Sequence, residues 1–483
     1  MTCLAGWGTF AALGLACSNG KPRTESPPLT SCRLEGLGVE ARCGSLSELE
    51  DRAQPDGRRI ELHFAVVPAL SARPQPDPLF ILVGGPGQAA TQAGGPIVRA
   101  LHDVQRSRDI VLLDQRGTGG SHALRCEEDL EGGSLERRFA PRLELEKTER
   151  CRAALDADPA RYTTDIAMDD LDDLRRTLGY DRINLWGGSY GTRAALVYYR
   201  QHPEHVRSLT LDGAAPFAIE LPLYVGRDSQ RALDLLYADC EKEPDCAATF
   251  PAARARLEAL LERLGRAPES IGVTHPRSGE RESIRVEREG LNSVLLNLLY
   301  VPDLAALAPL GVERASQGNW DTLVGAAQAF SDAASIDVGR FLSVSCAEDV
   351  ARISTEAVDA QTRGTFLGAE WLQHLRQQCA VWRGADLPDS YFAPVTGDVP
   401  SLVLSGNIDP VTPPVWGELV ASQLSSSRHI VVPGGAHGVS SLGCVPELIA
   451  KFVEGADPTA LDAACVNQIE RPPFFTSLAG PKP

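Results

Sequence analysis

Several kinds of residue and motif are scarce or absent in this sequence of 483 residues, and each absence excludes a class of protein. No apolar run has the roughly 20 residues that a membrane-spanning helix needs. The 47 basic residues are outnumbered by 64 acidic ones, and the net charge of −17 gives no sign of the basic surface that binds nucleic acid. The sequence contains no Cys-x-x-Cys pair of the kind that binds zinc, and none of its glycine-rich segments has the Gly-Lys-Ser/Thr of a phosphate-binding loop.

The composition is that of a globular protein, with 43% hydrophobic and 23% charged residues. These values exclude a wholly disordered or a collagen-like chain. At roughly 150 residues per domain the length suggests about three domains, but one large α/β domain with an inserted lid has the same length.

The first 17 residues are interpreted as a secretory signal peptide. Residues 4–17 form an apolar segment of the right size that ends in small residues. A lipoprotein signal, with the lipid on Cys17, is a second interpretation, and a mis-started N-terminus is a third. No Lys or Arg precedes the segment, and Gly14 stands where lipoprotein signals have leucine, which counts against the first two. Residues 18–30 are polar and proline-rich, which predicts a linker.

The cysteines support export independently. There are twelve, of which Cys3 and Cys17 belong to the signal segment. The other ten fall into neighbouring pairs along the chain: Cys32 and Cys43, Cys126 and Cys151, Cys240 and Cys246, Cys346 and Cys379, and Cys444 and Cys465. Such an even set is typical of disulfides formed in an oxidising compartment. Pairing of nearest neighbours is one connectivity among those the sequence allows.

Short apolar runs that end at turn residues predict a parallel sheet buried on both faces. The runs are 60–67, 79–83, 109–113, 183–186 and 206–211, with helical patterns at 169–178 and 192–202. This alternation of strand and helix predicts the α/β class.

The pattern changes between residues 215 and 395. Apolar stripes with helical spacing occupy 227–240, 252–264, 291–300 and 320–329, and strand signals are few. Strands return at 401–404 and 429–432. We therefore expect an α/β core in two pieces, 31–214 and 396–483, with a mainly helical cap, 215–395, inserted between them.

The segment 187–191 has the pattern Gly-x-Ser-x-Gly, with Ser189 at its centre. The pattern alone is weak, but here it follows the apolar run 183–186 and opens the helix 192–202. That context is typical of a nucleophile elbow, in which a sharp turn exposes a serine hydroxyl at the end of a strand. We predict that Ser189 is a nucleophile; a purely structural turn is the alternative.

A serine nucleophile needs a base and a carboxylate that orients the base, which in this fold follow it in the order acid, then histidine. Asp409 and His437 each lie just after one of the returning strands, at the same end of the sheet as Ser189. We predict that His437 is the base and Asp409 the acid. Asp212, at the end of another strand, is the alternative acid.

The negative charge that develops on the attacked carbonyl oxygen needs backbone N–H donors. One expected donor is Tyr190, the residue after the nucleophile. The second is expected from the loop 84–87, whose glycines let the backbone approach a substrate closely. Gly85 is favoured, with Gly84 as the alternative.

Three motifs together resemble one family. Gly84-Gly-Pro-Gly87, Asp114-Gln-Arg-Gly-Thr-Gly-Gly-Ser121 and Gly187-Gly-Ser-Tyr-Gly191 are similar to those of the prolyl aminopeptidase and tripeptidyl aminopeptidase group of α/β-hydrolase serine peptidases. The stretch 402–465 resembles the terminal domain of the secreted bacterial tripeptidyl aminopeptidases. Val83 departs from the pattern, because prolyl aminopeptidases have histidine there.

The resemblance implies an α/β-hydrolase fold and an exported exopeptidase that removes residues from the free N-termini of peptides. The mechanism requires no metal and no organic cofactor, and no nucleic-acid partner is expected. The membrane would be contacted only through a lipid on Cys17. A carboxylic ester hydrolase with the same triad is the alternative, and a non-catalytic surface-binding protein is a third hypothesis.

Two acidic features have a structural and a functional interpretation. Asp114 and Arg116 are expected to form a buried ion pair that holds the loop beside the oxyanion site, rather than to contact substrate. Glu348 and Asp349 lie in a segment that also resembles the secreted branch. The hypothesis is that at least one of them binds the substrate ammonium group; the alternative is a solvated surface pair.

Overall fold

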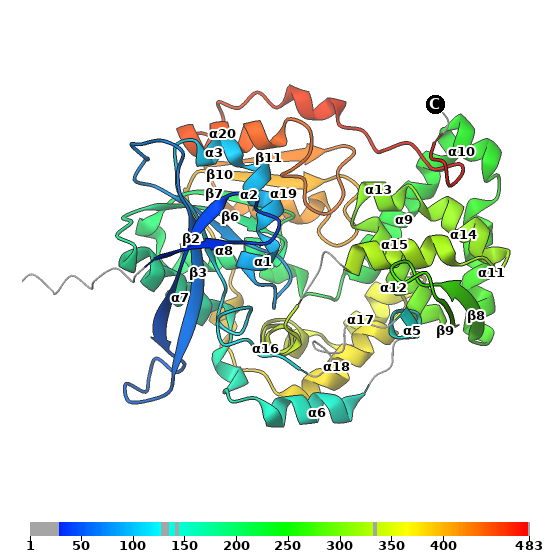
Figure 1. Ribbon diagram of the computed structural model, residues 1–483, viewed down its shortest axis with the longest axis horizontal. Coiled ribbons are helices and arrows are strands. Elements are labelled where there is room, and N and C mark those ends of the chain that lie inside the picture. Colours follow the sequence, from blue (N-terminus) through cyan, green and yellow to red (C-terminus); the bar gives the residue numbers. More distant parts are fainter. Residues whose placement is uncertain (1–28, 127–134, 141–143, 332–335, 482–483) are drawn as a thin grey trace, which may run out of the picture.

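The computed structural model describes residues 29–126, 135–140, 144–331 and 336–481. The predicted signal peptide, Cys17 and nearly all of the predicted linker lie outside these residues. The fold is built around one nine-stranded sheet with the order β1-β2-β3-β5-β4-β6-β7-β10-β11 (Figure 1). Its strands are β1 (Thr30–Arg33), β2 (Glu40–Leu49), β3 (Arg59–Val67), β4 (Leu79–Leu82), β5 (Ile110–Leu113), β6 (Ile183–Gly188), β7 (Val206–Asp212), β10 (Ser401–Gly406) and β11 (Ser427–Val432).

The sheet is mostly parallel, as the sequence predicts. Strands β5, β4, β6, β7, β10 and β11 run in one direction, and β1, β2 and β3 join them through antiparallel pairs. Alternate residues of a strand face opposite sides of a sheet. Thus Phe80 and Leu82 of β4 pack in one hydrophobic cluster, whereas Leu79 and Ile81 pack in another on the opposite face.

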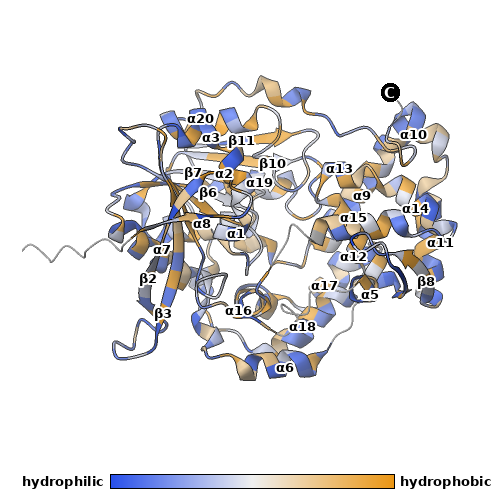
Figure 2. Cartoon of the chain, viewed as in Figure 1, coloured by the Kyte–Doolittle hydropathy of each residue, from blue (hydrophilic) through white to orange (hydrophobic). Residues whose placement is uncertain are grey.

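Helices cover both faces of this sheet, which completes the α/β architecture (Figure 1). The core helices are α1 (Ala90–Ala93), α2 (Gly95–Ala100), α3 (His102–Gln105), α7 (Thr164–Thr177), α8 (Tyr190–Gln201), α19 (Pro414–Gln423) and α20 (Val445–Gly455). Figure 2 shows the apolar strands in the interior and mixed polarity along the covering helices. Two further helices, α5 (Leu135–Phe139) and α6 (Leu145–Ala154), lie between β5 and β6 in sequence.

A mainly helical insertion separates β7 from β10. Its helices are α9 (Val225–Lys242), α10 (Pro244–Thr249), α11 (Ala253–Arg266), α12 (Arg288–Leu299), α13 (Pro302–Ala305), α14 (Ala308–Ser316), α15 (Asp321–Ser331), α16 (Val338–Glu348), α17 (Thr355–Thr362) and α18 (Glu370–Trp382). Short 3₁₀ turns complete the chain: η1 (Pro159–Arg161), η2 (Pro203–His205), η3 (Phe217–Ile219), η4 (Val350–Arg352), η5 (Asp389–Phe392) and η6 (Ala464–Gln468).

Two features of the insertion differ from the sequence prediction. A two-stranded hairpin, β8 (Glu269–Thr274) and β9 (Arg281–Val286), was not expected, because its residues are largely polar and only one face is covered. In addition, α5 precedes the predicted cap in sequence but packs within the hydrophobic core of the cap. Phe139 of α5 stacks edge-on against Trp320 at 6.3 Å between ring centroids, a contact across 181 positions that local patterns do not encode.

The insertion divides into two packed groups. Helices α9, α11, α12, α14 and α15 share one large apolar cluster. Figure 1 shows these helices on the right. Helices α16 and α18 instead pack with α6 in a separate small cluster around Leu342, Leu375 and Trp382. The second group therefore packs against α6, a helix that precedes the insertion in sequence.

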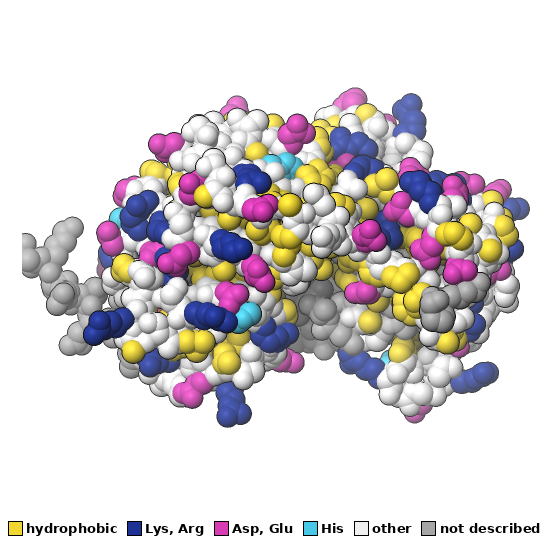
Figure 3. All heavy atoms as spheres, turned by 90° about the horizontal axis from the view of Figure 1, so that it is seen from above, with side chains coloured by type: hydrophobic (Ala, Val, Ile, Leu, Met, Phe, Trp, Pro, Cys, Tyr) yellow, Lys and Arg dark blue, Asp and Glu magenta, His cyan; other side chains and the backbone are white. Residues whose placement is uncertain are grey.

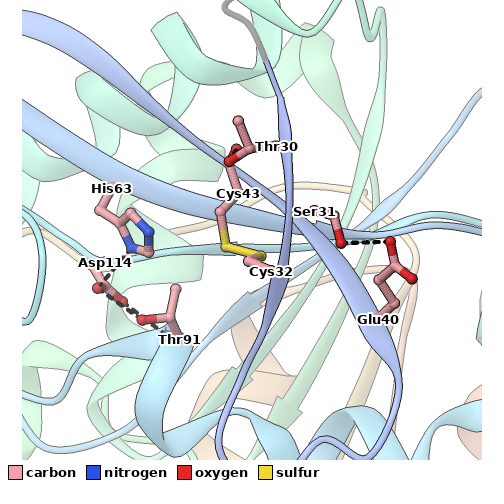
Figure 4. The surroundings of a disulfide bond; sticks show 8 residues. All are labelled: Thr30, Ser31, Cys32, Glu40, Cys43, His63, Thr91 and Asp114. Atoms are coloured by element: carbon pink, nitrogen blue, oxygen red, sulfur yellow. Dashed lines mark hydrogen bonds and ion pairs between the residues drawn. A yellow bond between two sulfur atoms is a disulfide. The ribbon is translucent and has the colours of Figure 1, made fainter.

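Five disulfides join nearest neighbours along the chain, which confirms that connectivity among those left open. They are Cys32–Cys43, Cys126–Cys151, Cys240–Cys246, Cys346–Cys379 and Cys444–Cys465. Figure 4 shows the first of them linking β1 to β2 at the edge of the sheet. Every cysteine of the described residues is thus oxidised.

Surface charge is mixed rather than segregated. Figure 3 shows acidic and basic side chains interspersed over one face, with no continuous basic patch on that face. Within the described residues, no helix is both long enough and apolar enough to cross a membrane.

We predict that the folded protein has no free thiol among these ten cysteines. Ellman titration of the denatured, unreduced Cys3→Ser/Cys17→Ser chain should give less than one thiol per molecule. The Cys444–Cys465 bridge closes the segment that follows His437, so its reduction should lower both activity and melting temperature. Several free thiols per chain would contradict the structure.

Candidate active site

Ser189 lies at the turn between β6 and α8, where the sequence predicts it. Its backbone has φ 53° and ψ −122°, a strained region for a residue with a side chain. The turn is possible because of neighbouring glycines: a Cβ on Gly191 would collide with the Leu82 carbonyl, and one on Gly187 with the Gly191 carbonyl. The strained turn leaves Ser189 on the wall of a cavity rather than within the core.

The glycine loop after β4 lies directly against this turn. A Cβ on Gly84 would come within 2.5 Å of the Ser189 Cβ, so only glycine permits the approach. Gly85 has a positive φ of 79° and lines the same cavity as Ser189. Tyr190 begins α8, and its side chain is buried. The loop after β4 and the N-terminus of α8 thus both lie next to the serine.

Asp409 and His437 come from the loops after β10 and β11, and the structure brings them into contact. The Asp409 Oδ2 lies 2.9 Å from the His437 Nδ1. The other carboxylate oxygen accepts the backbone N–H groups of Val411 and Thr412, each at 2.8 Å. The Thr412 hydroxyl donates to Oδ2 at 2.8 Å. Asp409 is fully buried, and these bonds fix the direction of its carboxylate.

The two groups support each other's charged form. Burial opposes ionisation of Asp409, but the charge and hydrogen bond of His437 and the N–H groups of the loop lower its pKa. Burial alone would lower the pKa of His437, but the Asp409 carboxylate outweighs burial and raises it. An imidazole held this way is suited to accept a proton and to be stabilised as an imidazolium ion.

Asp212, the alternative acid, has a different set of partners. Its carboxylate accepts the backbone N–H groups of Val439 and Ser440 at 2.8 to 3.0 Å and the Ser440 hydroxyl at 2.6 Å. The indole N–H of Trp186 donates to the same hydroxyl at 2.9 Å. Asp212 therefore anchors the loop just beyond His437, while Asp409 contacts the imidazole ring itself.

A cavity of about 560 Å³ joins these elements. Its lining includes Gly84, Gly85, Ser189 and His437 from the core, and Asn297, Tyr300, Phe330 and Ile336 from the insertion. Tyr300, just after α12, packs edge-on against the His437 ring at 4.9 Å between ring centroids. The backbone carbonyl of Tyr300 accepts a hydrogen bond from the backbone N–H of His437 at 3.3 Å. The insertion therefore forms one wall of the site. The sequence did not predict which residues of the insertion form this wall.

The predicted Asp114–Arg116 pair is wrong, although both residues are buried. Asp114 accepts the backbone N–H and the hydroxyl of Thr91 at 2.8 and 2.9 Å (Figure 4). Arg116 pairs instead with Asp170 of α7 at 2.6 Å. Neighbouring residues of this loop face different helices, so adjacency in sequence did not identify the partners.

The structure does not place Glu348 and Asp349 where either interpretation expected them. Both are buried, so they are not a solvated surface pair, and neither lines the cavity. Asp349 forms a bidentate pair with Arg193 at 2.7 and 3.0 Å, and Glu348 binds Thr164. With their oxygens engaged inside the chain, they are unavailable to a substrate ammonium group.

Sequence reasoning missed several residues that complete the site, including Thr412, Tyr300 and Ser440. Thr412 follows Asp409 by three positions, a spacing typical of a side chain that caps its own turn, and that signal was present in the sequence. Tyr300 and Ser440 gave no such signal. Among the described residues there is no group of three or more His, Cys, Asp or Glu that could hold a metal ion.

Comparisons with known proteins agree with this architecture. The family model of the α/β hydrolase fold matches residues 77–269, and a model described as TAP-like protein matches 364–465. Serine protease Hip1 of Mycobacterium tuberculosis is 26% identical over 95% of this chain and 97% of its own length. Tripeptidyl aminopeptidase of Streptomyces lividans is 27% identical over 35% of each chain.

A proline iminopeptidase of Neisseria gonorrhoeae is 30% identical over 30% of this chain and 34% of its own length. A solved proline iminopeptidase of Mycobacterium smegmatis aligns at 17% identity with a TM-score of 0.44, covering 86% of this chain and 100% of that one.

The class is therefore clear: the chain is a serine hydrolase of the α/β-hydrolase fold. Within that fold its residues 364–465 match the TAP-like model, and parts of the chain are similar to tripeptidyl aminopeptidases and proline iminopeptidases, as the motifs predicted.

The contacts of the two candidate acids predict different effects of mutation. Asp409→Asn should lower kcat by about 10²- to 10⁴-fold, because the His437 tautomer and its charge are no longer supported. Asp212→Asn leaves the Asp409–His437 contact in place, so we expect a loss at least ten times smaller, together with a lower melting temperature. Steady-state kinetics and thermal unfolding of both variants check this ranking, and the reverse order would make Asp212 the acid.

A pH profile tests the coupling of His437 to Asp409. His437 must be neutral to accept a proton, so reactivity should fall as the pH drops through its raised pKa. Asp409→Asn removes the charge that raises this pKa, so the acid limb should move to lower pH. The rate of Ser189 labelling by a fluorophosphonate, measured from pH 4 to 9, gives the pH at which reactivity is lost on the acid side even when turnover is slow. An unmoved limb would show that another group controls it.

Proposed function

We propose that this chain is an exported serine exopeptidase that releases short peptides or amino acids from free peptide N-termini. The observation that supports this most is the arrangement of Ser189, His437 and the buried Asp409 at one edge of the sheet, with Ser189 and His437 on the wall of one cavity. The elements arrive in the order serine, acid, histidine that α/β hydrolases use.

In the proposed mechanism, Ser189 Oγ attacks the scissile carbonyl carbon while His437 accepts the serine proton. Asp409 holds the imidazole in the right tautomer and stabilises the imidazolium. The N–H groups of Tyr190 and Gly85, with Gly84 as the alternative to Gly85, bind the oxyanion. His437 then protonates the leaving amine, and water hydrolyses the acyl-enzyme by the same route in reverse.

Peptides are favoured over esters as substrates because of the relatives. Similar proteins include a serine protease matched along 95% of this chain, and a tripeptidyl aminopeptidase and a proline iminopeptidase matched along 35% and 30% of it. The insertion supports action at a chain end, since Tyr300, Phe330 and Ile336 cover the cavity beside the serine. Ester hydrolysis by the same triad is the second candidate, because the acyl-transfer steps are shared.

Export is supported by the five disulfides, which persist in oxidising compartments. We propose that residues 1–17 direct the chain out of the cytoplasm, and that a lipid on Cys17 is the means of any attachment to the membrane. We propose two domains, a core of residues 31–214 and 396–483 and a cap of residues 215–395. Helix α5 belongs to the core by sequence but packs in the apolar cluster of the cap.

A substrate panel tests the proposal. Chromogenic aminoacyl and tripeptidyl amides, with free and with blocked N-termini, are compared with acyl esters. We expect amides with free N-termini to be cleaved and blocked ones to be cleaved at least tenfold more slowly. Cleavage of esters alone would favour the second candidate, and equal rates on blocked peptides would exclude an exopeptidase.

Ser189→Ala should abolish turnover and fluorophosphonate labelling, because it removes only the hydroxyl of a residue that faces the cavity. Its melting temperature should stay within a few degrees of the parent protein. Substantial residual turnover by Ser189→Ala, or labelling at another serine, would move the nucleophile elsewhere.

A further inference from the structure

A buried hydrogen-bond chain links the insertion to the residue that carries the oxyanion N–H. It begins at Glu348, the last residue of α16, passes through Thr164, the first residue of α7, and ends at Tyr190, the first residue of α8. Glu348 and Thr164 are fully buried, and Tyr190 is 3% exposed. The mechanism proposed above uses the backbone of Tyr190 but none of these three side chains.

The direction of the chain follows from its donors. The Thr164 backbone N–H donates to Glu348 Oε1 at 2.7 Å, and the Thr164 hydroxyl donates to Oε2 at 2.9 Å. A hydroxyl has one proton to donate, and the Thr164 hydroxyl donates it to Glu348. Toward Tyr190 the Thr164 oxygen can therefore only accept a hydrogen bond. The Tyr190 hydroxyl, 2.7 Å away, is therefore the donor.

Burial raises the pKa of the Glu348 carboxyl, and the groups around it oppose that rise. The Glu348 carboxylate lies at the N-terminus of α7, where free N–H groups and the helix dipole stabilise a negative charge. Arg193 lies 3.8 Å away, and it also pairs with Asp349. A carboxylate without such partners would not be tolerated in the interior. On the far side, Arg340 of α16 approaches the Tyr190 hydroxyl at 3.5 Å.

We propose that Glu348 is a positioning residue for the oxyanion site: through Thr164 it fixes the Tyr190 side chain, and with it the backbone N–H beside Ser189. This inference rests on the proposed function. Its consequence is that α16, although part of the inserted segment, is a fixed support of the catalytic turn. The other group, α9, α11, α12, α14 and α15, packs in its own apolar cluster and contributes no residue to this hydrogen-bond chain.

Three conservative changes cut the chain at different points. Thr164→Val removes the hydroxyl and keeps the shape, and Tyr190→Phe removes the terminal donor. Glu348→Gln replaces an acceptor oxygen by an N–H₂ group, which reverses the direction of the chain and leaves the Tyr190 proton without an acceptor. Losing an oxyanion donor costs about 10²- to 10³-fold in kcat, and a displaced donor costs less.

We expect each variant to lower kcat by about tenfold, equivalent to about 1.4 kcal/mol, with KM changed less than twofold. The affinity for a boronic acid inhibitor, whose tetrahedral adduct places an oxygen in the oxyanion site, should fall by a similar factor. The double variant Thr164→Val/Tyr190→Phe should lose no more than either single variant, because both interrupt one chain.

Asp172→Asn is the matched control. Asp172 is also buried and also accepts a tyrosine hydroxyl from α8, that of Tyr198 at 2.9 Å, but two turns away from Ser189. It should lower the melting temperature without changing kcat or boronate affinity.

The possible outcomes separate the two proposals. Variants with parental kcat and boronate affinity but a lower melting temperature would overturn the positioning role and leave Glu348 with stability alone. Additive losses in the double variant would also overturn it. If the parent protein neither reacts with fluorophosphonate nor binds the boronic acid, the proposed function itself fails. Should Glu348→Gln not fold, the Thr164 and Tyr190 variants still decide the question.

Discussion

The site depends on one constraint: parallel strands end at the same edge of a sheet. Strands β4, β6, β7, β10 and β11 run side by side in one direction, so the residues that follow them meet in space. Gly84, Ser189, Asp212, Asp409 and His437 each follow or end one of these strands. Residues spread over more than three hundred positions of sequence are therefore brought to one edge by the sheet itself, where their loops then bond to one another.

That constraint also explains what could be predicted. Local signals identified strands β3 to β7, β10 and β11, the elbow at Ser189 and the loops of Asp409 and His437, because each is a short pattern in or beside an apolar strand. Signals were weakest where contacts are long-range. Arg116 was assigned to Asp114, two positions away, but pairs with Asp170, and α5 joined the core of the insertion. The sequence did not predict β1, β2 or the hairpin of β8 and β9, because these strands lack the continuous apolar run by which the other strands were found.

Adjacent acids show the same limit in electrostatic terms. A carboxylate pair such as Glu348 and Asp349 can be exposed, bind a cation or be buried with internal partners, and the sequence of the segment is the same in all three cases. The choice is made by Arg193 and Thr164, which lie 156 and 184 positions away and are reached only by folding. Burying these acids is tolerated because a guanidinium and a helix N-terminus replace the lost water.

The contacts of α16 indicate which part of the insertion can move relative to the core. A lid that opens for substrate must exchange its contacts with the core for water, which is costly where the contacts are buried and charged. Arg340, Glu348 and Asp349 make contacts of that kind, whereas Tyr300 and Phe330 meet the cavity through apolar surfaces. Any movement that admits a peptide is therefore expected in α12 and α15 rather than in α16. Substrate access and oxyanion geometry would then be controlled by different parts of one insertion, so specificity could change without disturbing the catalytic turn.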